Sequence, residues 1–184
     1  MSFRLNFKPS FLAILAVLIL AVSPAAQAQL RPMVYTDTYV DADVETVWAD
    51  WTTAEGLESF FAPKAIVEGK LGGAYEIWFL PEAPKGQRGA EDGVLLGWQD
   101  SSEDGTRMIQ FTWRMPPYMP EIVDSMTVVQ VWMVPQGENK TRVRLFHTGF
   151  GDTPQWLEAE RYFEGSWNEV LKSYRAHIAA ENKE

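Results

Sequence analysis

Histidine is the side chain best suited to move protons near neutral pH, and the sequence contains two, His147 and His177. His147 ends a strand-like segment in phase with Val143 and Leu145, which would place its ring near the mouth of an enclosed space. The competing role is structural, a hydrogen bond to the backbone of the turn that follows. His177 lies near the end of a helical segment, where a cation suits the helix dipole, and is expected to be structural or exposed.

Glu76 is the second candidate for acid-base chemistry, because it interrupts an apolar strand-like segment between Tyr75 and Ile77. A carboxylate buried there without a partner would be costly. If Glu76 and Arg114 both face inward, they form a polar anchor in an apolar pocket, which is typical of a small-molecule site. If both face outward, they are solvated surface residues.

Several other chemistries lack their sequence motifs. The chain has no cysteine and no His-x-x-x-His pair, which argues against a disulfide framework and a zinc site. It also has no Gly-x-Ser-x-Gly nucleophile and no glycine-rich loop opening a helix. The net charge of −9 argues against nucleic acid as a partner. We therefore expect no recognisable catalytic motif, no metal and no cofactor.

Aromatic side chains give the stronger signal, because the chain contains eight tryptophans. Aromatic residues in the strands and in the last helix are expected to line a cavity for an apolar small molecule. The competing role is a solid core, which is the usual position for such residues. The seven residues predicted to line the cavity are Tyr75, Trp78, Trp113, Trp132, Phe163, Trp167 and Tyr174.

The segment from Met115 to Pro120 is apolar but too rich in proline to form a strand or a helix. Exposed methionine and tyrosine side chains need a surface to cover or a partner to meet. Met115, Tyr118 and Met119 are therefore predicted to form a lid over the cavity. A rigid plug against the edge of the sheet is the equal alternative.

The elements that position these residues follow from hydrophobic periodicity. A long helix is predicted from Thr153, as its cap, to about Ala180, because apolar residues recur there at steps of three and four. Apolar residues at helical spacing also predict a short helix from Val44 to Trp51 and a second short helical turn at Leu57 to Phe61. Seven strands are expected, at 33–40, 65–68, 74–80, 94–99, 107–113, 126–134 and 141–147. The pattern predicts an α+β fold in which a curved antiparallel sheet wraps around the C-terminal helix, with short helices after the first strand.

Residues 1–28 have the pattern of a secretory signal peptide. Arg4 and Lys8 precede an apolar run, and Ala26-Gln27-Ala28 gives a cleavage site after Ala28. Cleavage would remove no acidic residue, so the mature chain would carry a charge of −11. We expect a single domain at residues 29–184, located in the periplasm or secreted, without stable membrane insertion after cleavage.

This order of elements resembles the helix-grip fold of the START-like, or SRPBCC, superfamily. Short motifs in the right order narrow the resemblance to the branch of the Hsp90 ATPase activator homologue (AHSA1-like). They are Val44-Glu45-Thr46-Val47-Trp48, Gly72-Gly73-Ala74-Tyr75, Phe111-Thr112-Trp113, Thr141-Arg142-Val143-Arg144-Leu145, His147-Thr148-Gly149-Phe150 and Gly165 to Leu171. Ser166 stands between Gly165 and Trp167, where relatives commonly have glycine directly before the tryptophan. The superfamily has no universal catalytic residues, so the resemblance implies none here.

The leading prediction is an exported protein that holds a hydrophobic small molecule between its sheet and its C-terminal helix. A cofactor-independent cyclase or dehydratase would use the same cavity, with His147 or Glu76 moving protons. A protein-protein module, involved in envelope stress or acting like a chaperone factor, is the third possibility and requires a protein partner.

Overall fold

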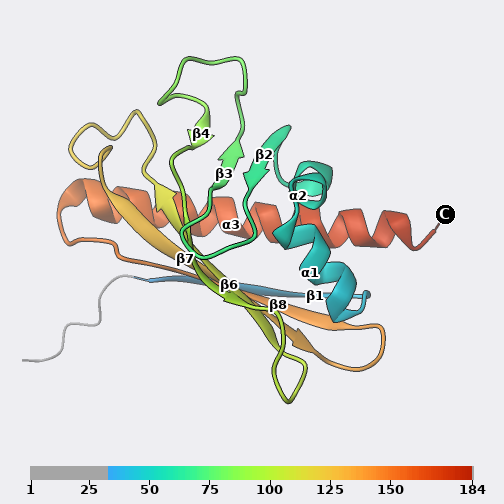
Figure 1. Ribbon diagram of the computed structural model, residues 1–184. Helices are drawn as coiled ribbons and strands as arrows, with labels where there is room; N and C mark the ends of the chain where they lie inside the picture. The colour runs from blue at the N-terminus through green and yellow to red at the C-terminus, as the bar shows by residue number, and fades with distance from the viewer. Residues whose placement is uncertain (1–32, 184) are drawn as a thin grey trace, which may run out of the picture. The chain divides into compact units, whose positions relative to one another are not determined.

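Five antiparallel strands form the main sheet of the computed structural model, which describes residues 33–183 (Figure 1). Their spatial order is β1-β8-β7-β6-β5. The predicted signal peptide lies outside the described residues. The strands are β1 (Val34–Val40), β5 (Leu95–Gln99), β6 (Arg107–Arg114), β7 (Met126–Pro135) and β8 (Thr141–Thr148).

A smaller sheet continues from the β5 edge. It has the order β2-β3-β4, with β2 (Lys64–Val67), β3 (Tyr75–Trp78) and β4 (Gly89–Ala90). A bridge between Ala74 and Val94 and backbone hydrogen bonds between Leu95 and residues 72–73 connect the two sheets, and the pairing of β5 shifts register between Leu95 and Gly97. The sequence predicted only a loop where β4 forms, because two residues are too few to show an alternation.

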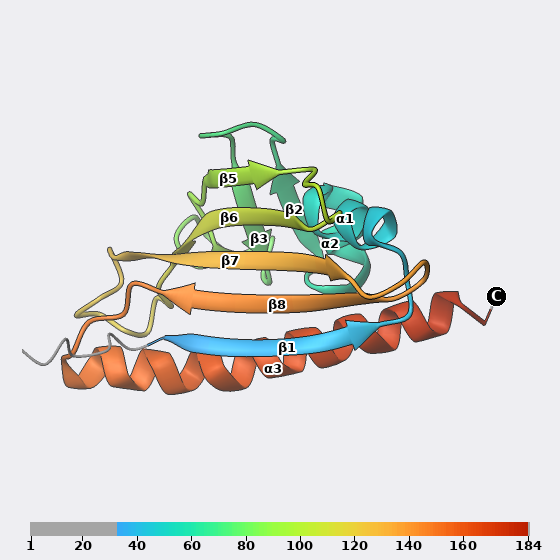
Figure 2. The same ribbon diagram turned by 90° about the horizontal axis from the view of Figure 1, so that it is seen from below.

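The C-terminal helix α3 (Pro154–Glu181) runs the length of the main sheet (Figure 2). Pro154 lies in its first turn, where a missing N–H costs nothing. Thr153 occupies the N-cap position as predicted, but its side chain makes no capping hydrogen bond. One face of the helix is buried, formed by Ala159, Phe163, Trp167, Leu171, Tyr174 and Ile178.

Two short helices follow β1, namely α1 (Val44–Thr52) and α2 (Ala54–Phe60). The Asp43 carboxylate caps α1 by accepting a hydrogen bond from the N–H of Thr46 at 2.7 Å. Thr53 caps α2 in the same way, by accepting from Gly56 at 3.0 Å. The absence of a side chain at Gly56 lets α2 start directly against α1, because a Cβ atom there would lie 2.6 Å from the Asp50 carbonyl oxygen.

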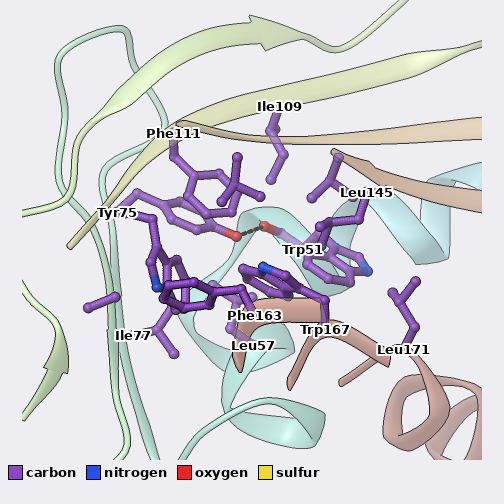
Figure 3. Close-up of a cluster of buried hydrophobic side chains, with 14 of the residues drawn as sticks. Trp51, Leu57, Tyr75, Ile77, Ile109, Phe111, Leu145, Phe163, Trp167 and Leu171 are labelled. Carbon is purple, nitrogen blue, oxygen red and sulfur yellow. Dashed lines mark hydrogen bonds between the residues drawn. The ribbon is translucent and has the colours of Figure 1, made fainter. Parts of the chain in front are cut away.

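The core lies between the inner face of the sheets and the helices (Figure 3). Aromatic rings fill much of it. Trp113 and Trp167 meet with ring centroids 4.8 Å apart, and Trp51 meets Tyr174 at 5.7 Å. The hydroxyl of buried Tyr75 donates to the Trp51 carbonyl at 2.9 Å. Most of the expected space between sheet and helix is therefore occupied by side chains.

The architecture confirms the predicted α+β class, with a curved antiparallel sheet gripping a long C-terminal helix. Among residues 33–183, no helix combines the length and the apolar character needed to cross a membrane.

Candidate functional site

A cleft of about 290 Å³ opens beside the first half of α3, where the core is incompletely filled. Four parts of the chain surround it: α3 itself, Phe61 at the end of α2, the end of β6 with residues 114–118, and the segment from Phe79 to Ala90, which ends in β4. Phe79, Leu80, Tyr118 and Tyr162 are exposed on its rim, so the cleft communicates with solvent. Its volume is near the lower end of the roughly 300–1,000 Å³ typical of ligand sites.

The floor of the cleft is aromatic. Trp113 from β6 and Phe163 and Trp167 from α3 line it, and Phe61 stacks on Trp113 with ring centroids 6.1 Å apart and planes 9° apart. Phe163 and Trp167 are one helical turn apart and share a face of α3. Ser166 lies on the same side and donates its hydroxyl to the Tyr162 carbonyl at 2.9 Å.

The proline-rich segment forms one wall. Met115 and Met119 are each only 1% exposed, so both anchor the segment in the core. Of the three residues predicted to form a lid, only Tyr118 lines the cleft. Tyr118 lines the cleft with 59% of its surface exposed, and its ring meets Tyr162 edge to face at 6.0 Å. The segment is therefore a plug that carries a single exposed aromatic ring to the rim.

Glu91, a buried carboxylate, holds the opposite wall in place. It accepts hydrogen bonds from the N–H groups of Gly86 at 2.7 Å and Arg88 at 3.0 Å. Gly89 completes the wall with a positive φ of 143°. A Cβ atom there would lie 2.5 Å from the Ile77 carbonyl oxygen, so only glycine allows β4 to pair this closely. A glutamate inside a polar loop gave no sequence signal of this role.

Three of the seven predicted cavity residues, Trp113, Phe163 and Trp167, lie together on the cleft floor. Tyr75 and Tyr174 are buried deeper, in the packed core. The Tyr174 hydroxyl donates to an Asp50 carboxylate oxygen at 2.8 Å, and burial raises the pKa of Asp50. Burial also raises the pKa of Tyr75 far above its ordinary range. These two tyrosines contribute to the core and do not reach the cleft.

Trp78 and Trp132 lie outside the cleft, which corrects the prediction for both. On β3, Tyr75 and Ile77 are buried, so Trp78 and Glu76 project from the other face. There the indole N–H of Trp78 donates to the Glu76 carboxylate at 2.7 Å. On β7 the buried residues are Val129, Val131 and Met133, so the intervening Trp132 faces outward. Glu76 therefore cannot act on a molecule in the cleft.

Arg114 lines the cleft wall but is already held by carboxylates. Its guanidinium donates to Asp92 at 2.8 Å and lies 3.9 Å from Asp124. Asp92 has a φ of 57°, an uncommon backbone conformation for a residue other than glycine. The predicted anchor formed by Glu76 and Arg114 is absent, since the two residues do not share a site.

His147 is fully buried behind the cleft floor and has both ring nitrogens occupied. The indole N–H of Trp167 donates to Nδ1 at 3.0 Å. Nε2 therefore carries the proton and donates to the Thr127 hydroxyl at 2.6 Å, and that hydroxyl donates to the Trp113 carbonyl at 3.0 Å. Burial lowers the pKa of His147 to about 3. The residue is a neutral structural link between two cleft tryptophans. Of the two roles that the sequence left open, the structure shows the structural one, with side-chain partners in place of the turn backbone.

His177 lies near a serine and a glutamate, the residue types of a serine-histidine-acid triad, but their geometry differs from that of a triad. Its Nε2 lies 3.2 Å from the Ser59 hydroxyl and 3.5 Å from a Glu181 carboxylate oxygen. A serine-histidine-acid triad needs the acid on the other ring nitrogen, so the geometry is not catalytic. Among residues 33–183, no group of three or more His, Asp or Glu side chains could hold a metal ion.

A sheet that grips a long helix, with an aromatic cleft at one end, defines the chain as a helix-grip domain of the SRPBCC type. Residues 41–179 match the family model described as activator of Hsp90 ATPase homolog 1-like protein. The chain belongs to this family. No curated protein gives a significant match to the sequence.

Solved structures share the fold at low sequence identity. The Aha1 dimer from Colwellia psychrerythraea is 18% identical with a TM-score of 0.56, covering 79% of this chain and 95% of that one. CalU16 from Micromonospora echinospora is 15% identical with a TM-score of 0.57, covering 79% and 73%. Norcoclaurine synthase from Thalictrum flavum is 11% identical with a TM-score of 0.51, covering 83% and 87%. At these identities the likeness concerns the fold alone.

Proposed function

We propose that the chain binds a small, ring-containing apolar molecule in the cleft beside α3. The observation that carries this proposal is a hollow of about 290 Å³ whose floor consists of Phe61, Trp113, Phe163 and Trp167. Such rings offer flat apolar faces, which favour offset-stacked or edge-to-face contact with another ring. The volume favours a molecule of one or two rings over a long-chain lipid.

A distant structural neighbour with the same fold binds ligands of this kind. The structure of norcoclaurine synthase from Thalictrum flavum is a complex with dopamine and hydroxybenzaldehyde, both of which are single-ring molecules. This likeness supports the size and kind of ligand, and it does not extend to the reaction. Both His147 nitrogens are engaged within the core and Glu76 lies on another face, so binding is better supported than proton transfer.

The proposal includes export, which rests on the sequence pattern of residues 1–28. A mature N-terminus beginning at Gln29 in protein recovered from the periplasm or the medium would support it. Full-length chain found only in the cytoplasm would contradict it. This part of the proposal is independent of the cleft.

The binding proposal can be tested by native mass spectrometry of protein purified from its own host, followed by denaturing extraction of any bound molecule. Ser166→Phe would place a ring in the cleft, whereas Ser173→Phe adds the same ring to an exposed position on the same helix. We expect an apolar molecule bound one to one in the wild type and in Ser173→Phe, and absent from Ser166→Phe. An empty wild-type protein, or a bound molecule that survives Ser166→Phe, would contradict the proposal.

A further inference from the structure

The outer face of the main sheet, opposite the helices, is not covered by any other part of residues 33–183 (Figure 2). Cross-strand pairing places Tyr39 beside Arg142 and Tyr35 beside Phe146 on this face. It also places Trp132 beside Arg144. These neighbours form one surface, which we call the outer-face patch, made of Tyr35, Tyr39, Trp132, Arg142, Arg144 and Phe146.

Cations in the outer-face patch are held against aromatic rings. The guanidinium carbon of Arg144 lies 5.2 Å from the centre of the Phe146 ring and 5.9 Å from that of Tyr35. The guanidinium of Arg142 lies 5.5 Å from the ring of Tyr39. Such contacts attract the cation to the ring face and fix a long, flexible side chain in one orientation. Tyrosine, tryptophan and arginine are also the residue types that contribute most to protein interfaces.

The two arginines differ in how their charges are compensated. Arg142 donates through Nε to an Asp37 carboxylate oxygen at 2.6 Å. Within the described part of the chain, Arg144 has no carboxylate at ion-pair distance, and its buried Nε has no hydrogen-bond acceptor. An unsatisfied charged donor costs free energy. A carboxylate from outside would not reach this buried nitrogen, but it would pair with the two terminal guanidinium nitrogens of Arg144, which are not among the buried unsatisfied atoms of the described residues.

The charge of this face contrasts with that of the whole chain. The chain carries −9, whereas three cations, Lys140, Arg142 and Arg144, lie on or beside this face. Asp37 pairs with Arg142, and Asp41 lies near Tyr39 and Lys140. A long polyanion such as nucleic acid would be repelled by the acidic remainder of the protein. A short acidic segment interacts mainly with charges within a Debye length of about 8 Å, so it would be attracted by the nearby cations. Two copies of the patch meeting about a two-fold axis would bring like charges together.

The spacing between Arg142 and Arg144 indicates the conformation that an acidic partner segment would have. Arg142 and Arg144 are two residues apart on β8 and project from the same face, so they are separated by roughly 6.6–6.8 Å along the strand. Carboxylates at alternate positions of an extended peptide have the same separation. We propose that the outer-face patch docks an extended acidic segment of a partner protein, with alternate Asp or Glu side chains on Arg142 and Arg144 and an apolar side chain on Trp132.

Selection from a displayed library of random 12-residue peptides tests this proposal with the mature protein as bait. We expect the enriched peptides to carry Asp or Glu at alternate positions and to bind at least tenfold more weakly to Arg144→Gln. Arg161→Gln removes the same charge from an exposed position on α3, and it should bind like the wild type. Matching circular dichroism and unfolding midpoints would show that both variants fold.

Three results would overturn the proposal. The first is selection that yields no acidic peptides, or peptides that bind Arg144→Gln as well as the wild type. The second is an equal loss in Arg161→Gln, which would indicate nonspecific attraction by charge. The third is a different occupant of the patch. Binding to a 12-nucleotide single strand that is tighter than binding to the peptides would assign the patch to nucleic acid, and a dimer that Arg144→Gln dissociates would assign it to a second copy of the chain.

Discussion

Acid should destabilise this protein through His147, which is held neutral in the core between Trp167 and Thr127. The pKa of His147 is about 3 in the folded protein, against an ordinary value of 6.5. As the pH falls, the unfolded state therefore takes up a proton before the folded state does. The stability from this group is fully present above about pH 6.5 and is lost progressively as the pH falls toward 3.

The size of the effect follows from the two pKa values. Between pH 7.5 and pH 5.2, His147 alone should lower the free energy of unfolding by about 1.7 kcal/mol, with a slope approaching about 1.4 kcal/mol per pH unit. The lower pH stays above the sequence pI of about 4.8, where precipitation would interfere. Asp43 also loses stabilisation in acid because hydrogen bonds lower its pKa, so the test must compare variants.

Urea unfolding followed by tryptophan fluorescence, repeated across this pH range, measures the slope. His147→Gln keeps a neutral acceptor and donor, so it should lack the contribution of His147 while retaining that of the carboxylates. Thr127→Val keeps the histidine but removes its acceptor, so it should be less stable by about 1–3 kcal/mol at every pH and keep the wild-type slope. Equal slopes for the wild type and His147→Gln would refute the reasoning.

Three further substitutions test how the helices are built. Gly56→Ala should destabilise by about 1–3 kcal/mol in thermal or urea unfolding, because its Cβ would lie 2.4 Å from the Asp50 Cα atom. Gly165→Ala, in the same assay, should stabilise by about 0.5–1 kcal/mol, because no atom lies within 4 Å of its Cβ position and alanine favours a helix; a loss of stability would contradict this account. Asp43→Ala should cost about 1 kcal/mol at neutral pH by removing the cap on Thr46, and the difference from wild type should shrink as acid protonates the carboxylate.

Much of the fold follows from local periodicity. The apolar steps of three and four predict a helix from after Thr153 to about Ala180, and α3 spans Pro154–Glu181. The main-sheet strands lie within one or two residues of their predicted ranges. These segments are long and strongly patterned, so each one specifies its own secondary structure without help from its neighbours.

The faces of the strands were harder to predict. On β7 one row is Thr127, Val129, Val131 and Met133, and the other is Val128, Gln130, Trp132 and Val134. Both rows contain apolar residues, so alternation separates two faces without showing which one is inside. This ambiguity led to the wrong placement of Trp132.

The cleft likewise depends on contacts between distant segments. Trp113, Phe163 and Trp167 could be selected from the sequence because they are large and lie on patterned elements. Tyr162 and Pro117 could not, because their part in the cleft exists only where α3 passes the end of β6.

The sequence by itself determined the helices, the strands and the fold class, because these depend on residue types a few positions apart. The tertiary structure decided that Met115 and Met119 anchor a wall, that His147 is enclosed by Trp167 and Thr127, and that Arg144 lies unpaired on an open face. Burial, hydrogen-bond satisfaction and charge compensation depend on which distant residues meet. No local pattern contains that information.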